Sequence, residues 1–122
     1  MKTFWVAASL TALWVLPALA ADDVMAAFYG NTIVSTGGGV EFHTHYRADH
    51  SFDLAGSMML MSHTFKGTWA VDGKGDICRT YIGEAPPGTP NPNCSPLVPR
   101  KVGDSWTSKD GTHTLTLKAG VL

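Results

Sequence analysis

The chain has 122 residues, a formal net charge of −1 and only 16% charged residues. It has neither a basic stripe nor the motif of an RNA- or DNA-binding module, which argues against nucleic-acid binding. The length beyond residue 20 suits one domain with a modest core of its own.

Residues 1–20 have the pattern of a secretory signal peptide. Lys2 gives a positive start, an apolar helix-forming run follows, and Ala18-Leu19-Ala20 supplies the small residues that precede a cleavage site. The apolar run is short for a bilayer span, which disfavours a retained membrane anchor. We therefore expect cleavage after Ala20, one β domain at 21–122 without a membrane span, and a periplasmic or secreted location.

The residues after the signal predict one short helix followed by strands. Asp22 and Asp23 occupy positions where a helix N-terminus favours anions, and Gly30 stands where a helix would stop, so we expect a helix at about 23–29. Thr32-Ile33-Val34 is a β-branched strand candidate. Runs between turn signals then predict strands at 40–47, 51–56, 58–71, 76–82, 103–108 and 112–118.

Strands at this spacing, joined by short turns, predict a mainly β fold arranged as an antiparallel meander. The sheet must pack against the short N-terminal helix or curl into a small, partly open barrel. Cys78 and Cys94 are expected to form one disulfide, because an even pair in an exported protein is normally oxidised. The segment EAPPGTPNPN between them predicts an exposed loop, since each proline removes a backbone donor.

The segment EFHTHYRADHSFD at 41–53 holds three of the five histidines. A three-residue turn at 48–50, with His50 left-handed, separates polar from apolar side chains across the predicted hairpin, whereas a two-residue turn mixes them. In that register His45 lies opposite Asp53. The polar cluster on one face then comprises Glu41, His43, His45 and Asp53.

This cluster is a candidate metal site. The H-x-H pattern on a strand presents two imidazoles on one side, so His43, His45 and Asp53 could bind Zn(II) or Cu(II). The alternative is an ordinary solvent-facing sheet surface that carries a His45–Asp53 pair.

A second metal candidate lies in the methionine-rich segment that follows. Met59, Met61 and His63 share strand parity and could supply soft ligands to Cu(I), as in exported copper-handling proteins. The alternative is that the methionines fill a core or line an apolar pocket. No other cofactor is predicted.

The favoured function is a non-catalytic binding or accessory protein for an unknown small molecule or protein partner. Small barrels hold apolar ligands among aromatic side chains, although the same side chains can simply fill the core. An enzyme that uses the His45–Asp53 pair for acid–base chemistry is a further alternative, but the sequence has no G-x-S-x-G, P-loop or H-E-x-x-H motif. The candidate ligand-binding residues are Phe42, Tyr46, Phe52, Phe65, Trp69 and Trp106.

Two segments carry a family resemblance. Tyr29-Gly30-Asn31-Thr32, followed by Gly67-Thr68-Trp69 and then Ile77-Cys78, resembles small exported bacterial proteins of uncharacterised function with G-N-T, G-T-W and cysteine-bearing strand motifs. The resemblance implies a periplasmic antiparallel sheet or partial barrel and no particular activity. Gly67-Thr68-Trp69 is also similar to the G-x-W of lipocalins, which implies a lipocalin-like curled sheet.

Overall fold

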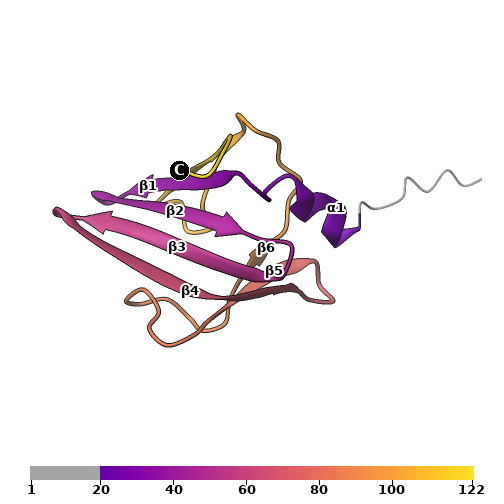
Figure 1. Cartoon of the computed structure of the whole chain (residues 1–122), viewed down its shortest axis with the longest axis horizontal. Helices are drawn as coiled ribbons and strands as arrows, with labels where there is room; N and C mark the ends of the chain where they lie inside the picture. The colour runs from indigo at the N-terminus through magenta and orange to yellow at the C-terminus, as the bar shows by residue number, and fades with distance from the viewer. Residues whose placement is uncertain (1–19) are drawn as a thin grey trace, which may run out of the picture.

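The structure is a computed structural model that describes residues 20–122, so the predicted signal peptide lies outside the described residues except for Ala20. The eight strands of these described residues belong to one antiparallel sheet with the order β6-β5-β4-β3-β2-β1-β8-β7 (Figure 1). The elements are α1 (Ala21–Ala26), β1 (Thr32–Gly37), β2 (Val40–Tyr46), β3 (Ser51–Met58), β4 (Met61–Val71), β5 (Asp76–Tyr81), β6 (Asn93–Pro96), β7 (Ser105–Thr107) and β8 (Thr114–Lys118).

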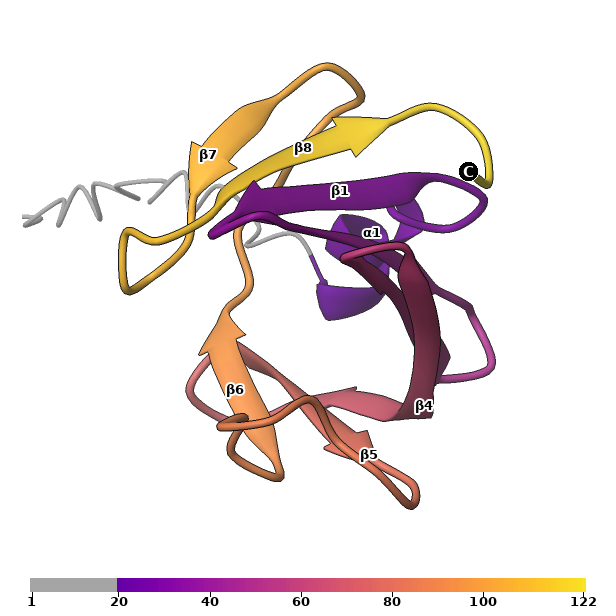
Figure 2. The same cartoon turned by 90° about the vertical axis from the view of Figure 1, so that its left-hand side faces the viewer.

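The sheet curls into a half-barrel, and α1 lies inside the curl (Figure 2). Its edge strands β6 and β7 follow each other in the sequence, so residues 97–104 connect the two edges. The predicted mainly β, partly open barrel with a short N-terminal helix is therefore confirmed. Within residues 20–122, no helix has the length and apolar character needed to cross a membrane.

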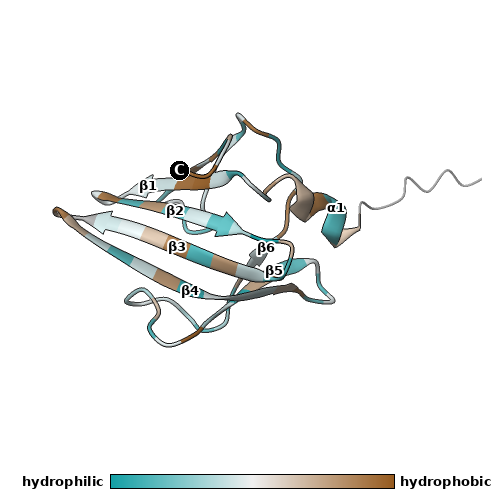
Figure 3. Ribbon diagram, in the orientation of Figure 1, coloured by the Kyte–Doolittle hydropathy of each residue, from teal (hydrophilic) through white to brown (hydrophobic). Residues whose placement is uncertain are grey.

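The concave face of the sheet and the helical segment share one hydrophobic core. Hydrophilic and hydrophobic residues alternate along the strands, as the bands on β3 illustrate (Figure 3), and this alternation directs one set of side chains inward. Gly67 allows β4 and β5 to approach closely, because a Cβ there would collide with the main-chain oxygen of Thr80. The core comprises Val24, Met25, Phe28, Ile33, Tyr46, Phe52, Leu54, Trp69, Ile77, Tyr81 and Leu117.

The β2–β3 hairpin has the predicted register and turn. His45 lies opposite Asp53, and His50 is left-handed with a φ of 68°. The His50 ring stacks on the Trp69 ring with centroids 4.0 Å apart, and its Nδ1 lies 3.1 Å from the Trp69 main-chain oxygen. These contacts offset the backbone cost of a non-glycine residue in this region.

The main differences from the predicted elements concern β4, the helix and β6. The predicted strand 58–71 begins instead at Met61, because the chain turns at Met59 and Leu60, which have positive φ values of 49° and 69°. The predicted helix 23–29 is replaced by Ala21–Ala26, followed by hydrogen-bonded turns up to Asn31. Strand β6 is not among the predicted strands, since it has only four residues and ends in proline.

The predicted disulfide joins Cys78 to Cys94, which are paired positions on β5 and β6. The proline-rich segment between these strands is a loop, as predicted. Its base is also held by Asn91, whose side-chain oxygen accepts a hydrogen bond from the Tyr81 N–H at 3.0 Å. The disulfide therefore fixes the edge strand β6, which has only β5 as a neighbour in the sheet.

Candidate functional site

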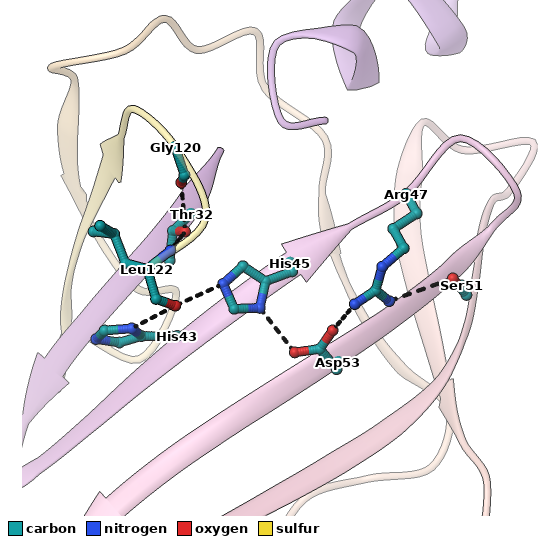
Figure 4. A network of polar contacts seen from close by, with 8 residues as sticks. All are labelled: Thr32, His43, His45, Arg47, Ser51, Asp53, Gly120 and Leu122. Atoms are coloured by element: carbon teal, nitrogen blue, oxygen red, sulfur yellow. Dashed lines mark hydrogen bonds and ion pairs between the residues drawn. The ribbon is translucent and has the colours of Figure 1, made fainter. Parts of the chain in front are cut away.

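The predicted polar cluster exists on the convex face, outside the half-barrel. His45 Nδ1 lies 2.8 Å from Asp53 Oδ2, and Arg47 forms an ion pair with the other oxygen of the same carboxylate (Figure 4). His43 Nε2 lies 3.2 Å from Glu41 Oε2. The structure thus brings together the two histidines and the carboxylates that the hairpin register predicted.

The other nitrogen of each histidine faces the end of the chain. His45 Nε2 lies 3.1 Å from the Leu122 main-chain oxygen, and His43 Nδ1 lies 3.4 Å from the same atom (Figure 4). A neutral imidazole donates from one nitrogen only, whereas an imidazolium donates from both. Because the partners of His45 are both acceptors, only its imidazolium form donates both hydrogen bonds.

Residues 119–122 are also fastened to the start of β1. The Thr32 hydroxyl donates to the Gly120 main-chain oxygen at 2.8 Å and accepts from the Leu122 N–H at 3.0 Å. The Asn31 side-chain oxygen accepts from the Gly120 N–H at 3.0 Å. The Gly30-Asn31-Thr32 motif therefore ends the helical segment and holds the last residues of the chain over β1 and β2.

The convex cluster has the architecture of a structural network. In residues 20–122, no three His, Cys, Asp or Glu side chains lie together in an arrangement that could hold a metal ion. The nitrogen of His45 that a catalytic His–Asp pair would present to a substrate faces Leu122 instead. Metal binding by His43, His45 and Asp53 stays a prediction, as does acid–base chemistry by the same residues.

The second metal candidate lies at the far end of the sheet from α1 (Figure 1). Met59 stands in the β3–β4 turn and is 89% exposed, while Met61 on β4 is 78% exposed. His63 contacts the Phe65 ring, with centroids 4.5 Å apart, and its Nε2 lies 3.2 Å from Glu84. Because Met59 is in the turn, the strand parity that suggested this copper site does not extend to it.

The six aromatic residues predicted to bind a ligand all lie on the concave side. Tyr46, Phe52 and Trp69 are buried in the core, and the other three, Phe42, Phe65 and Trp106, are partly buried against it. Tyr46 and Trp106 line a cavity, whereas the other four do not contribute to its lining. Their role in ligand binding stays a prediction.

This cavity of about 120 Å³ lies inside the half-barrel, between the two ends of the curled sheet. Strands from both ends contribute to it, and the crossing segment 97–104 supplies further walls. Most of its lining is aromatic or aliphatic. The lining residues are Phe28, Ile33, Thr44, Tyr46, Ile77, Arg79, Ser95, Pro96, Leu97, Val98, Arg100, Trp106 and Leu115.

Two arginines are the charged members of this lining. Arg79 Nε is buried and has no hydrogen-bond partner in residues 20–122, and the Arg100 guanidinium carbon lies 4.2 Å from the centroid of the Trp106 ring. The neighbouring Tyr46 phenol raises the pKa of Arg79 above its ordinary value, although burial acts in the opposite direction. Arg79 therefore stays charged inside the half-barrel.

Neither arginine is among the site residues predicted from the sequence. A signal for Arg79 does exist, since it alternates with Ile77 and Tyr81, which are buried residues of β5. A charge at the apolar parity of a strand predicts an inward-facing cation. Arg100 has no such signal, because it lies in an irregular segment whose path depends on where β6 and β7 pair.

Comparison of the chain with protein families, with curated proteins and with solved structures finds no match. The fold is nevertheless the curled antiparallel sheet that the resemblance to small exported bacterial proteins implies. Membership of such a family stays a prediction.

Proposed function

We propose that the protein is a non-catalytic binding protein that holds a small molecule in the cavity of the half-barrel. The observation that carries this proposal is the cavity itself, about 120 Å³ in volume and bounded by aromatic and aliphatic side chains. Concave, mostly apolar sites with a few polar groups are the usual form of small-molecule sites. The mouth of a curled sheet is also a common location for them.

The volume sets the size of the ligand. An engineered apolar cavity of about 150 Å³ holds benzene. The cavity of about 120 Å³ therefore suits a compound with one ring or a short acyl chain. A larger ligand would have to extend past the segment 97–104.

The proposed site of action is an oxidising compartment outside the cytoplasm. The disulfide between Cys78 and Cys94 supports this location, because disulfides persist in the periplasm and in secreted proteins. The signal-like pattern of residues 1–20 supports the same route.

The proposal predicts that filling the cavity abolishes binding. Ser95 lines the cavity and is paired with Ile77, so a Ser95→Phe variant should occupy the space that a ligand would take. We expect ring-sized compounds found by ligand-observed NMR with the unmodified protein to lose at least about tenfold in affinity for this variant. A Thr107→Phe variant, altered at an exposed position of β7, is the matched control and should keep the affinity.

The result that contradicts the proposal is equally direct. A screen of ring-sized acids, alcohols and amines that produces no binder would contradict the proposed function. So would binders whose affinity is the same for the Ser95→Phe variant as for the Thr107→Phe variant.

A further inference from the structure

Arg79 lies on the concave face of the sheet and is partly buried there. It is paired with Trp69 across β4 and β5, so the two side chains share the concave face. Trp69 is 2% exposed there, and the phenols of Tyr46 and Tyr81 neighbour the guanidinium. The strand register therefore directs a permanent positive charge into the half-barrel.

This charge has no counter-ion in residues 20–122. Each ion pair formed by these residues involves other cations, and Arg47 on the opposite face has Asp53 as its partner. Arg79 Nε in addition lacks any hydrogen-bond partner in the same residues. The Arg79 side chain is only partly buried, but burial of Nε without a hydrogen-bond partner costs free energy that an anionic ligand would recover.

The guanidinium of Arg100 adds a second positive charge to the cavity lining. Arg100 lies over the Trp106 ring and lines the same cavity, whereas no Asp or Glu belongs to the lining. The aromatic contact satisfies part of the charge of Arg100 and holds the side chain near the cavity. The cavity thus combines apolar walls with two cations and no anion.

We infer that the ligand is a small organic carboxylate, whose carboxylate group is bound by Arg79 and whose apolar body, about the size of one ring, fills the cavity. This inference rests on the proposed function and adds the chemical class of the ligand. A guanidinium presents its N–H groups in a planar fork that matches a carboxylate. A carboxylate monoanion buries less charge than a phosphate dianion in a cavity whose lining is mostly aromatic and aliphatic.

The competing explanation is that Arg79 has a purely structural role. Its stem would pack against the tyrosines, and its charge would be satisfied by the Tyr46 phenol alone. In that case a neutral ligand and an anionic ligand of equal shape would bind with equal affinity. The preference of the unmodified protein for an acid over its neutral analogue therefore separates the two explanations.

The test uses benzoate and benzyl alcohol, which have the same ring and nearly the same size. We expect benzoate to bind roughly tenfold or more tightly than benzyl alcohol, because it makes a charge-assisted hydrogen bond that the alcohol lacks. Isothermal titration calorimetry gives the two affinities, and ¹H–¹⁵N NMR shifts at Arg79 and Trp106 report whether each compound enters the cavity.

Three variants test whether the preference for benzoate over benzyl alcohol depends on Arg79. Arg79→Met should remove the preference for benzoate over benzyl alcohol, whereas Arg79→Lys should keep part of this preference. Arg47→Met, a matched change on the convex face, should leave both affinities unchanged. If Arg79→Met does not fold, the ratio of the two affinities in the unmodified protein still decides.

Two outcomes overturn the inference, and they differ in what they say of the proposed function. Equal affinities for benzoate and benzyl alcohol, with both compounds in the cavity, would agree with the proposed function and contradict the inference that the ligand is a carboxylate. Absence of benzoate from the cavity would also contradict the inference that the ligand is a carboxylate. The proposed function would then depend on whether neutral ring-sized compounds bind there.

Discussion

At the scale of single residues, two positions illustrate what a sequence can reveal. The pairing of His45 with Asp53 was predictable, because side chains alternate with period two and one turn length separates polar from apolar faces. The contact of His45 with Leu122 was not, since these residues are 77 positions apart and meet only through the pairing of β8 with β1. The lack of a carboxylate beside Arg79 was also unpredictable, because it depends on all the residues that line the cavity, and these are distant in the sequence.

The turn that precedes β8 offers a pH test at this scale. Asp110 Oδ1 accepts hydrogen bonds from the Ser108 hydroxyl at 2.7 Å and from the Thr112 hydroxyl at 2.7 Å. These bonds favour the carboxylate and lower the pKa of Asp110 from 3.8 to about 2. The charged carboxylate therefore stabilises the fold above pH 3.8, and this contribution is lost as the pH falls towards about 2.

We expect a pH-dependent difference between the unmodified protein and an Asp110→Asn variant. The difference in unfolding free energy, measured by urea denaturation, should be constant above pH 3.8 and shrink as the pH falls to about 2. A Lys109→Gln variant, which changes the neighbouring residue and keeps the Asp110 carboxylate, should show a constant difference. A constant difference for Asp110→Asn across the same range would contradict the assignment.

At the scale of secondary-structure elements, the positions of some hairpin turns can be recognised from the sequence, and the position of one cannot. The β2–β3 and β7–β8 registers were predictable, because turn-forming residues mark where the chain reverses. The β3–β4 turn was predicted too early, since Met59 and Leu60 are not turn formers. Strand β6 was missed because it has only four residues and ends in proline.

The β3–β4 turn therefore carries a stability cost that can be measured. Met59 and Leu60 both have positive φ values in a two-residue turn, where Asn-Gly is preferred. We expect a Met59→Asn, Leu60→Gly double variant to raise the unfolding free energy by about 1–2 kcal/mol. Urea denaturation measures this change.

A control variant tests whether the increase in unfolding free energy comes from the turn itself. Ser62 is an exposed position of β4, so Ser62→Asn should give no increase in stability. An increase for Ser62→Asn, or none for the double variant, would show that the turn is not under the strain that its backbone angles indicate.

At the scale of the whole molecule, the curl of the sheet creates the candidate site. The mainly β, partly open barrel was predictable from strand spacing and chain length. The cavity was not, because its walls come from the helical segment, from both ends of the sheet and from the segment 97–104. Only the folded arrangement places Arg79 and Arg100 in one apolar cavity without a carboxylate.

The central claim is that this cavity holds a small carboxylate, and a crystal structure with benzoate tests it most directly. The account predicts the benzoate carboxylate within hydrogen-bond distance of the Arg79 guanidinium and the ring between Tyr46 and Trp106. Benzoate bound on the convex face, or a cavity that stays without it at concentrations that saturate binding in solution, would contradict the account.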